Sequence, residues 1–322
     1  MGLKDLESKW EEIDSFEDIK GFKALRISNE CIPDLFMAID KDGRRCLILF
    51  LPIESAELRD KEMENLSLIF IPQKEATLIR LQNANFIDLF NDLITSIYQK
   101  INDINDLTIA SSTFISIFSK WTHFFEPSNK LKLSEDEIRG VFGELSYLNN
   151  VLQMSSPGDG EKTIESWQGP FNKSNDFIFE SKNVEIKTKL DSASTVRISS
   201  EFQLEREFDK ALELCVISLK YDLSNGLSIS DILSKIVDHC RLHFIDLVGL
   251  YRALGKLSLT PSNIVEYNNF RYIISNVTIY DAGKSAFPKI CTSNLPEEIS
   301  NVKFSLRVST LDSFIIDQKD SL

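Results

Sequence analysis

The stretch Asp176–Lys187 places charged residues inside two short apolar runs, and this restricts how the chain can fold. The runs are rich in Phe, Ile and Val, and they predict a β-hairpin with its turn at residues 181–182. In this hairpin Asp176 lies opposite Lys187. Because side chains alternate between the two faces of a strand, Glu185 shares their face. The sequence therefore predicts two carboxylates and one ammonium group converging at the end of a hairpin.

Partly buried charges are costly unless they are paired or bind a metal ion. Two carboxylates at this spacing suit Mg²⁺, which takes one or two carboxylates together with waters and phosphate oxygens. Lys187 is then placed to hold a water that attacks phosphorus, while the metal stabilises charge on the phosphate oxygens and lowers the pKa of the water. The spacing is equally compatible with an ion-pair ladder from Asp176 to Lys187 on a solvent-facing hairpin.

The residues before this hairpin predict a helix. Ser134–Glu137 form a capping box for a helix that runs to about Leu152. Gly140 and Gly143 lie within it, although glycine weakens a helix interior. Their presence indicates that the helix approaches a sheet closely.

An Asp followed by eight residues and then Glu-x-Lys on an apolar strand resembles the PD-(D/E)XK nuclease superfamily. The Pro that usually precedes the Asp is replaced here by Asn175. Six blocks narrow the resemblance, and they occur in this order: Gly143-Glu144-Leu145, Trp167-Gln168-Gly169-Pro170, Asp176-Phe177, Val184-Glu185-Ile186-Lys187, Ser199-Ser200-Glu201-x-Gln203-Leu204 and Phe287-Pro288-Lys289-Ile290. Together they look like one family of PD-(D/E)XK proteins of bacteria and archaea, encoded beside restriction–modification and phage-defence genes.

The resemblance implies a metal-dependent DNA endonuclease. Asp176 and Glu185 would bind Mg²⁺ or Mn²⁺, with Glu144 as a further ligand or an orienting base, and Lys187 would position the attacking water. The alternative for Glu144 is an interfacial side chain paired with Arg139 or with a lysine. The Trp167 block is expected to be a structural turn that leads into the hairpin.

Three polar residues that follow the hairpin are further candidates. The resemblance places Gln203 against the metal site or a substrate phosphate, although Ser200-x-x-Gln203 is equally a helix-capping box. Lys189 and Arg197 are expected to contact DNA phosphates, which supply most non-specific affinity for DNA. Alternatively, both belong to a solvated loop.

The charge of the chain, taken alone, argues against a nucleic-acid-binding protein. There are 36 Lys and Arg against 49 Asp and Glu, a formal net charge of −13. Some of these acids are the proposed metal ligands, whose charge a bound cation offsets. We therefore expect modest, salt-sensitive affinity for double-stranded DNA, and a DNA-holding partner or a homodimer to supply the rest. The resemblance implies an ATPase or a methyltransferase as partner.

Cysteine usage and hydropathy indicate the compartment. The five cysteines are scattered without a Cys-x-x-Cys pair, which is typical of buried, reduced thiols in a cytosolic protein. No signal-peptide core follows Met1, and the longest apolar run, near residues 46–53, is far shorter than the roughly 20 residues of a membrane-spanning helix. The sequence predicts a soluble, cytoplasmic protein without a membrane partner.

The apolar patterns predict a mixed α/β (α+β) chain in three parts. Residues 1–129 are expected to form a β-rich N-terminal domain with trailing helices, residues 130–220 the nuclease core, and residues 221–322 an α+β segment packed on the core. For the core, the resemblance implies a restriction-endonuclease-like fold, in which helices flank a mixed central sheet. Strands are expected at residues 22–27, 46–51, 66–71, 76–81, 176–179, 184–187, 196–199, 214–220, 272–280 and 302–308. Helices are expected at residues 85–100, 110–125, 134–152, from about 201, 230–239 and 241–254.

Two functions from different classes fit this sequence. The first is the metal-dependent endonuclease of a restriction or phage-defence system. The second is a non-catalytic subunit that keeps the nuclease fold in order to bind DNA or to dock partner defence proteins. The presence of Asp176, Glu185 and Lys187 together favours the enzyme, whereas the acidic net charge leaves room for the subunit.

Overall fold

The computed structural model describes residues 3–15, 22–50, 60–126, 132–261, 263–320 and 322 of the chain. These residues form seven α-helices and several sheets, so the predicted mixed α/β class is confirmed. The chain divides into two compact units. Unit 1 comprises Met1–Asn129, Asp246–Gly255 and Thr260–Ser262, and unit 2 comprises Lys130–Ile245, Lys256–Leu259 and Asn263–Leu322. The domain boundary predicted at residue 129 falls outside the described residues.

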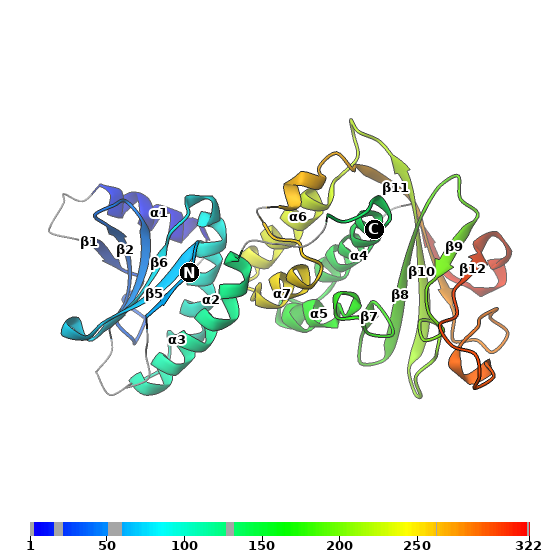
Figure 1. The fold of residues 1–322 in the computed structure, drawn as a ribbon, viewed down its shortest axis with the longest axis horizontal. Helices are drawn as coiled ribbons and strands as arrows, with labels where there is room; N and C mark the ends of the chain where they lie inside the picture. Colours follow the sequence, from blue (N-terminus) through cyan, green and yellow to red (C-terminus); the bar gives the residue numbers. More distant parts are fainter. Residues whose placement is uncertain (1–2, 16–21, 51–59, 127–131, 262, 321) are drawn as a thin grey trace. The chain divides into compact units, whose positions relative to one another are not determined.

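Unit 1 is built on a six-stranded antiparallel sheet with the order β1-β2-β3-β6-β5-β4. Its strands are β1 (Phe22–Arg26), β2 (Leu35–Asp40), β3 (Arg45–Phe50), β4 (Lys61–Glu62), β5 (Leu66–Ile71) and β6 (Ala76–Leu81). Helices α2 (Ile87–Ile101) and α3 (Leu107–Trp121) lie side by side against one face of the sheet (Figure 1). The later helix α7 (Val248–Lys256) joins them, because the Tyr251 hydroxyl donates to Asp92 Oδ2 at 2.8 Å.

Neither β2 nor the helix α1 (Leu3–Asp14) is predicted from the sequence. Helix α1 is mostly charged, and among its residues with described side chains Leu6, Trp10 and Ile13 form the buried stripe. The Trp10 indole N–H donates to Asn91 Oδ1 of α2 at 3.0 Å. A helix with so few apolar positions gains its stability from this tertiary contact and gives a weak periodic signal.

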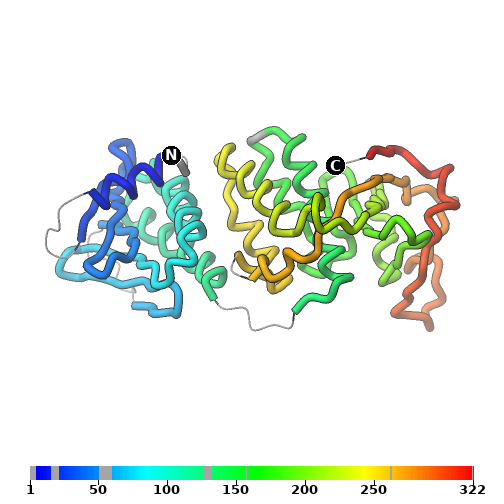
Figure 2. Tube along the Cα trace, turned by 90° about the horizontal axis from the view of Figure 1, so that it is seen from above, coloured from blue at the N-terminus to red at the C-terminus, as the bar shows by residue number. Residues whose placement is uncertain are grey.

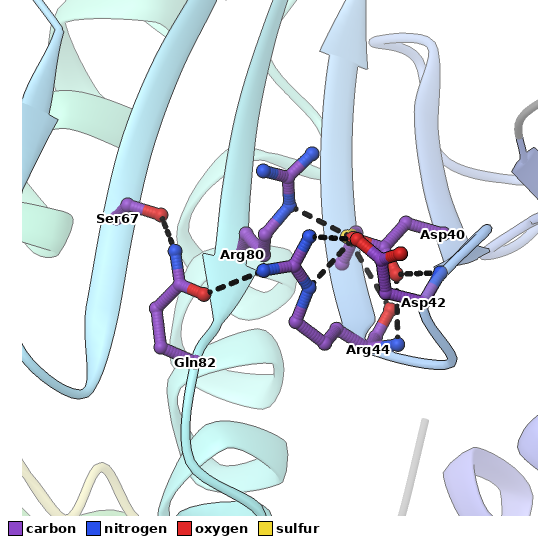
Figure 3. Close-up of polar contacts among 7 residues, drawn as sticks. Asp40, Asp42, Arg44, Ser67, Arg80 and Gln82 are labelled. Atoms are coloured by element: carbon purple, nitrogen blue, oxygen red, sulfur yellow. Dashed lines mark hydrogen bonds and ion pairs between the residues drawn. The ribbon is translucent and has the colours of Figure 1, made fainter.

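A buried carboxylate ties several strands of this sheet together (Figure 3). Asp40, at the end of β2, accepts a hydrogen bond from Arg44 Nε at 2.9 Å and forms an ion pair with Arg80 Nε at 3.1 Å. Arg44 Nη1 donates to Gln82 Oε1 at 3.0 Å, and Gln82 donates in turn to the Ser67 hydroxyl at 2.7 Å. Because two guanidinium groups pair with it, the Asp40 charge is tolerated inside the sheet.

Unit 2 contains a five-stranded mixed sheet with the order β13-β11-β10-β8-β7. Its strands are β7 (Phe177–Ile178), β8 (Lys182–Leu190), β10 (Ala211–Tyr221), β11 (Tyr272–Asp281) and β13 (Ile315–Lys319). Strands β8 and β10 are parallel, and the other neighbours are antiparallel. Two further strands, β9 (Thr195–Ile198) and β12 (Phe304–Arg307), pair with each other and are drawn in green and red in Figure 1 and Figure 2.

One face of the five-stranded sheet is covered by α4 (Glu135–Met154), which begins at the predicted capping box of Ser134 and Glu137. A Cβ built on Gly143 would lie 2.3 Å from Thr188 Cγ2 of β8, so this glycine permits the predicted close approach. Nothing lies within 4 Å of a Cβ built on Gly140. The prediction that Gly140 also permits a close approach to the sheet is therefore wrong. Helix α6 (Ile229–Leu242) packs against α4.

The opposite face of this sheet is covered by β9 and β12. Leu214 and Val216 of β10 belong to an apolar cluster with residues of these two strands. In the parallel register of β8 and β10, Glu185 is the partner of Leu214, and Lys187 is the partner of Val216. Paired residues point to the same face, so Glu185 and Lys187 face away from α4.

The prediction of a helix from about residue 201 is wrong, because residues 201–204 form a turn. The Ser199 N–H donates to Gln203 Oε1 at 2.7 Å. Glu201 accepts hydrogen bonds from the backbone N–H groups of residues 301–302 at 3.1 and 3.0 Å. The long-range contacts of Glu201 replace the local ones that would continue a helix, and a sequence pattern does not report such contacts.

Two general properties of the described residues bear on the predicted compartment. None of the helices they form combines the length and the apolar composition required to cross a membrane. All five cysteines are buried, and none of them forms a disulfide in the described part of the chain.

Candidate active site

The β7–β8 hairpin has a different register from the predicted one. Phe177 pairs with Val184, and the Phe179 N–H donates to the Lys182 carbonyl at 2.9 Å. The turn therefore lies at residues 180–181 and not at 181–182. Both registers close on a two-residue turn and bury the same faces, so neither loop length nor strand alternation distinguishes them.

This register changes the neighbour of Asp176. Phe177 pairs with Val184, so the preceding residue, Asp176, lies opposite Glu185. The predicted partner of Asp176 was Lys187. The difference amounts to two residues along β8. Because side chains alternate with a period of two, Asp176, Glu185 and Lys187 still share one face.

Asp176 lies just before β7 begins, at the edge of the sheet. Its Oδ2 accepts the N–H of Ile186 at 2.8 Å, in the place that a longer strand would occupy. Its carbonyl accepts the N–H groups of Gln168 at 2.7 Å and Gly169 at 3.0 Å. Burial raises the pKa of the Asp176 carboxyl, while the charge of Lys187 and the Ile186 hydrogen bond oppose this rise.

Glu185 and Lys187 form a buried ion pair, with Nζ of Lys187 2.7 Å from Oε1 of Glu185. Only 1% of the Glu185 side chain and 15% of the Lys187 side chain are exposed, so the pair is not a solvent-facing ladder. Burial raises the pKa of Glu185 to about 8; the nearby charge of Asp176 adds to the rise and Lys187 opposes it. Burial disfavours the charged form of Lys187, but Glu185 and Asp176 outweigh it and raise the pKa of Lys187, which stays an ammonium.

Helix α4 brings Glu144 to the same place. Its Oε2 accepts the indole N–H of Trp167 at 2.6 Å. Arg139, the alternative partner, instead donates to Asp136 on the exposed side of the helix. Burial raises the pKa of Glu144 well above its usual range, and the charge of Asp176 adds to the rise, while the Trp167 hydrogen bond opposes it.

The segment Trp167–Gly169 forms a further wall of the site, and sequence reasoning assigns it only a structural turn. Trp167 is fully buried. A Cβ built on Gly169 would lie 2.6 Å from Glu144 Oε2 and 2.9 Å from Asp176 Oδ1. The signal that points to this segment is a glycine beside a tryptophan within a block of the resemblance.

The other three candidates do not converge on this point. The Gln203 side chain bonds to the backbone of Ser199, and only the Gln203 carbonyl reaches the site, where it accepts from Asn175 Nδ2 at 2.8 Å. Arg197 is exposed and alternates with buried residues, so it lies on the outer side of β9. Lys189, further along β8, lines a polar pocket of about 500 Å³.

Three carboxylates, those of Glu144, Asp176 and Glu185, are candidates to hold a divalent cation. Across the described ranges, no group of three or more His, Cys, Asp and Glu residues is placed to hold one ion. A site of two carboxylates is nevertheless what Mg²⁺ commonly uses, because waters and substrate oxygens complete its shell. Glu144 Oε2 and Asp176 Oδ1 both lie against Gly169, and such hard oxygen donors suit Mg²⁺.

Comparison with known proteins gives one family. The family model described as "Putative PD-(D/E)XK family member, (DUF4420)" matches residues 6–309 of the chain. The matched range includes all the site residues discussed above, and it confirms the resemblance to a family of PD-(D/E)XK proteins. No curated protein and no solved structure matches the chain.

Proposed function

The chain belongs to this family of PD-(D/E)XK proteins, and from that membership we propose that it is a metal-dependent endonuclease for double-stranded DNA. The observation that carries the proposal is the convergence of Glu144, Asp176, Glu185 and Lys187 at one sheet edge. Ionising three buried carboxyls around one ammonium puts excess negative charge in a buried place, which weakens folding and contributes to the raised pKa of these carboxyls. A divalent cation offsets that charge, so the arrangement is better suited to catalysis than to stability.

Each residue has a task in phosphodiester hydrolysis. The ammonium group of Lys187, fixed by Glu185, holds the attacking water by a hydrogen bond and faces the charge of the phosphate. When bound, the cation stabilises negative charge on the phosphate oxygens and lowers the pKa of the water. The water oxygen forms a bond to phosphorus while the bond from phosphorus to O3′ breaks. The water loses one proton and O3′ gains one, so the products are a 5′-phosphate and a 3′-hydroxyl.

The cellular setting is part of the same proposal. We propose that the protein acts in the cytoplasm, within a prokaryotic restriction or phage-defence system, with an ATPase or a methyltransferase as partner. The net charge of −13 supports a requirement for a DNA-holding partner or a homodimer. Lys189 and Arg197 are the proposed phosphate contacts, and both lie outside the cluster of four charged residues.

The test is cleavage of supercoiled plasmid by the full chain with Mg²⁺ or Mn²⁺, compared with a sample containing a chelator. Glu185→Gln and Lys187→Met remove single charges from the site, and we expect each to lower the cleavage rate at least ~100-fold, the size of typical effects of general catalytic groups. Gly140→Ala is the matched control, because nothing lies within 4 Å of its added methyl. Cleavage that survives both charge substitutions would refute the site assignment.

The non-catalytic subunit makes the opposite prediction for the same assay. A protein of that kind binds DNA or a partner but leaves the plasmid intact with either metal ion, and also in the presence of an ATPase or methyltransferase encoded beside it. Binding by gel shift without any cleavage under these conditions would favour the subunit over the enzyme.

A further inference from the structure

A polar pocket of about 500 Å³ lies on the face of the five-stranded sheet that carries Lys187. Strands β8, β10 and β11 contribute its floor. Its walls are residues between 191 and 194, which lead into β9, and residues between 308 and 312, which follow β12. Ligand pockets in proteins commonly enclose about 300–1,000 Å³, so this one has room for a small molecule or for one unit of a polymer.

The register of the sheet places this pocket beside Lys187. Lys187 pairs with Val216 of β10, and Val216 pairs with Thr278 of β11; both Val216 and Thr278 line the pocket. Paired residues point to the same face, and neighbouring strands lie about 4.8 Å apart. The pocket therefore begins one strand away from the ammonium group that is proposed to face the scissile phosphate.

Lys189 belongs both to the pocket and to the strand of the active site. It lines the pocket and lies two residues beyond Lys187 on β8, on the same face and about 7 Å further along the strand. This step is close to the distance between neighbouring phosphates of one DNA strand. Within the described part of the chain, no carboxylate forms an ion pair with the Lys189 ammonium group, which is therefore available to a second phosphate.

The polar lining of the pocket suits a nucleobase better than a phosphate alone. Asn276 and Gln318 present carboxamides, each of which carries a donor and an acceptor. The Asn276 Oδ1 accepts the hydroxyl of Thr278 at 2.7 Å, which leaves the amide NH₂ group for a ligand. Asp191 and Asp312 also line the pocket, so a phosphate without a base would meet two carboxylates beside one ammonium.

Apolar side chains supply the remaining surface. Val216, Tyr280 and Ile315 line the same pocket, and the ring of Tyr280 is only 5% exposed, so it is fixed in place. Apolar and aromatic surface against the faces of a base, together with hydrogen-bonding groups at its edge, is how proteins hold a nucleotide that has left the base stack. The pocket combines both kinds of surface with a cation for the phosphate.

We propose that this pocket receives one nucleotide of the DNA strand that is cut, turned out of the duplex next to the scissile phosphate. Lys189 binds its phosphate, and Asn276 and Gln318 bind the edge of its base. The proposal rests on the proposed function, since it names the part of the DNA that the endonuclease engages beside the cut. Unpairing a base costs least at a mismatch, so the pocket also makes the choice of target depend on the local stability of the duplex.

The test is the fluorescence of DNA duplexes that each carry one 2-aminopurine, placed at successive positions and mixed with the full chain. Ca²⁺ serves as the divalent cation, chosen to hold the DNA without hydrolysis. Stacking in the duplex quenches 2-aminopurine, so the wild type should raise the fluorescence several-fold where the labelled base leaves the stack. A mismatch opposite that base should tighten binding, because part of the unpairing cost is removed.

Substitutions separate the base contacts from the phosphate contact. Asn276→Ala and Gln318→Ala should each bind the labelled duplex ~10-fold more weakly and reduce the fluorescence rise, with the salt dependence of binding unchanged. Lys189→Met should lower the slope of log affinity against log salt concentration by ~1. Gln153→Ala and Lys235→Met are the matched controls, because both residues are exposed on the helices across the sheet, and they should behave as the wild type.

Three results would overturn the proposal. The first is the absence of a fluorescence rise at every position, in matched and mismatched duplexes alike. The second is a rise that survives Gln318→Ala as well as Asn276→Ala; Gln318 is exposed on β13, so its variant decides if Asn276→Ala does not fold by circular dichroism. The third is calorimetric binding of free 2′-deoxyadenosine 5′-monophosphate that Asn276→Ala abolishes, without any rise in a duplex, since the pocket would then serve a free nucleotide.

Failure of this inference differs from failure of the proposed function. A fluorescence rise that is lost in the pocket variants of a protein that cuts no DNA would leave the pocket assignment standing and remove the endonuclease. Plasmid cleavage at equal rates by the wild type, Asn276→Ala and Gln318→Ala, without any fluorescence rise, would leave the endonuclease standing and remove the pocket assignment.

Discussion

The contact between α4 and β8 depends on the missing side chain of Gly143. A methyl group at this position would lie 2.3 Å from Thr188 Cγ2, and 3.6 Å from Ile186 Cγ2 and from Ile217 Cδ1. Ordinary carbon–carbon contacts are ~3.5–4.0 Å, so Gly143→Ala forces α4 and β8 apart. The separation affects the site directly, because Glu144 is the next residue of α4 and Lys187 precedes Thr188 on β8.

The size of the effect follows from two opposing contributions. Alanine in place of glycine inside a helix stabilises by ~1 kcal/mol. Overpacking a well-filled interior costs up to ~3 kcal/mol, and the overlap at Thr188 justifies the upper part of that range. We expect Gly143→Ala to be about 2 kcal/mol less stable than the wild type, and Gly140→Ala, which gains the helix contribution without a clash, to be about 1 kcal/mol more stable.

Urea unfolding followed by circular dichroism measures these differences. Thr188→Ser removes the Cγ2 that meets the new methyl, so the double variant Gly143→Ala/Thr188→Ser should recover most of the loss relative to Thr188→Ser alone. A Gly143→Ala protein as stable as Gly140→Ala would refute the reasoning, and so would a double variant that shows no recovery.

Three further predictions concern other parts of the chain. Ser134→Ala removes the capping box of α4 and should lower the free energy of unfolding by ~1 kcal/mol, measured by urea unfolding; an unchanged value would mean that the cap contributes nothing. Asp40→Asn removes the carboxylate that pairs with Arg80 and Arg44, of which Arg44 keeps its ion pair with Asp42, and should cost ~3 kcal/mol, the low end for a buried pair since both arginines are partly exposed; a differential scanning trace that matches the wild type would contradict it. Hydrogen bonds from its own N–H and from the N–H groups of residues 301–302 hold the pKa of Glu201 below its usual range, so this contribution is present above the unfolded-state pKa and is lost as the pH falls through the folded-state value. Hydrogen exchange at residues 301–302, corrected for the intrinsic rate, should therefore accelerate at acid pH, and Glu201→Gln should show the fast exchange already at neutral pH.

The sequence is most informative about the site where chemistry and strand periodicity coincide. Alternation along the strand 184–187 places Glu185 and Lys187 on one face. A shift of the hairpin by two residues keeps Asp176 on that same face, so its convergence with them follows without knowledge of the turn. The partner of Asp176 within the cluster does not follow, because two registers with a two-residue turn give the same alternation. The hydrogen bond between Trp167 and Glu144 is not predicted from the sequence. A side-chain contact between residues far apart in the chain produces no periodic pattern.

The same distinction between local signals and long-range contacts applies to the fold. The capping box at Ser134 and the apolar stripe that follows it are local signals, and α4 begins where they predict. Helix α1 places the buried side chains of Leu6, Trp10 and Ile13 among many charged residues, and the turn at Glu201 is held by the N–H groups of residues 301–302. Both depend on contacts with distant segments, which the local pattern does not contain. Both Gly140 and Gly143 interrupt the helical sequence of α4 in the same way. Only the residues that surround each in space show that Gly143 contacts the sheet and Gly140 does not.

The most direct test of the central claim is single-turnover cleavage of an end-labelled DNA duplex with Mn²⁺ in ¹⁸O-labelled water, comparing the wild type with Lys187→Met. If water activated beside Lys187 attacks phosphorus, the wild type yields 5′-phosphate ends that each carry one ¹⁸O atom, and Lys187→Met loses this cleavage at least ~100-fold while keeping its fold. Cleavage at the wild-type rate by Lys187→Met, or ¹⁸O in a 3′-phosphate, would contradict the account.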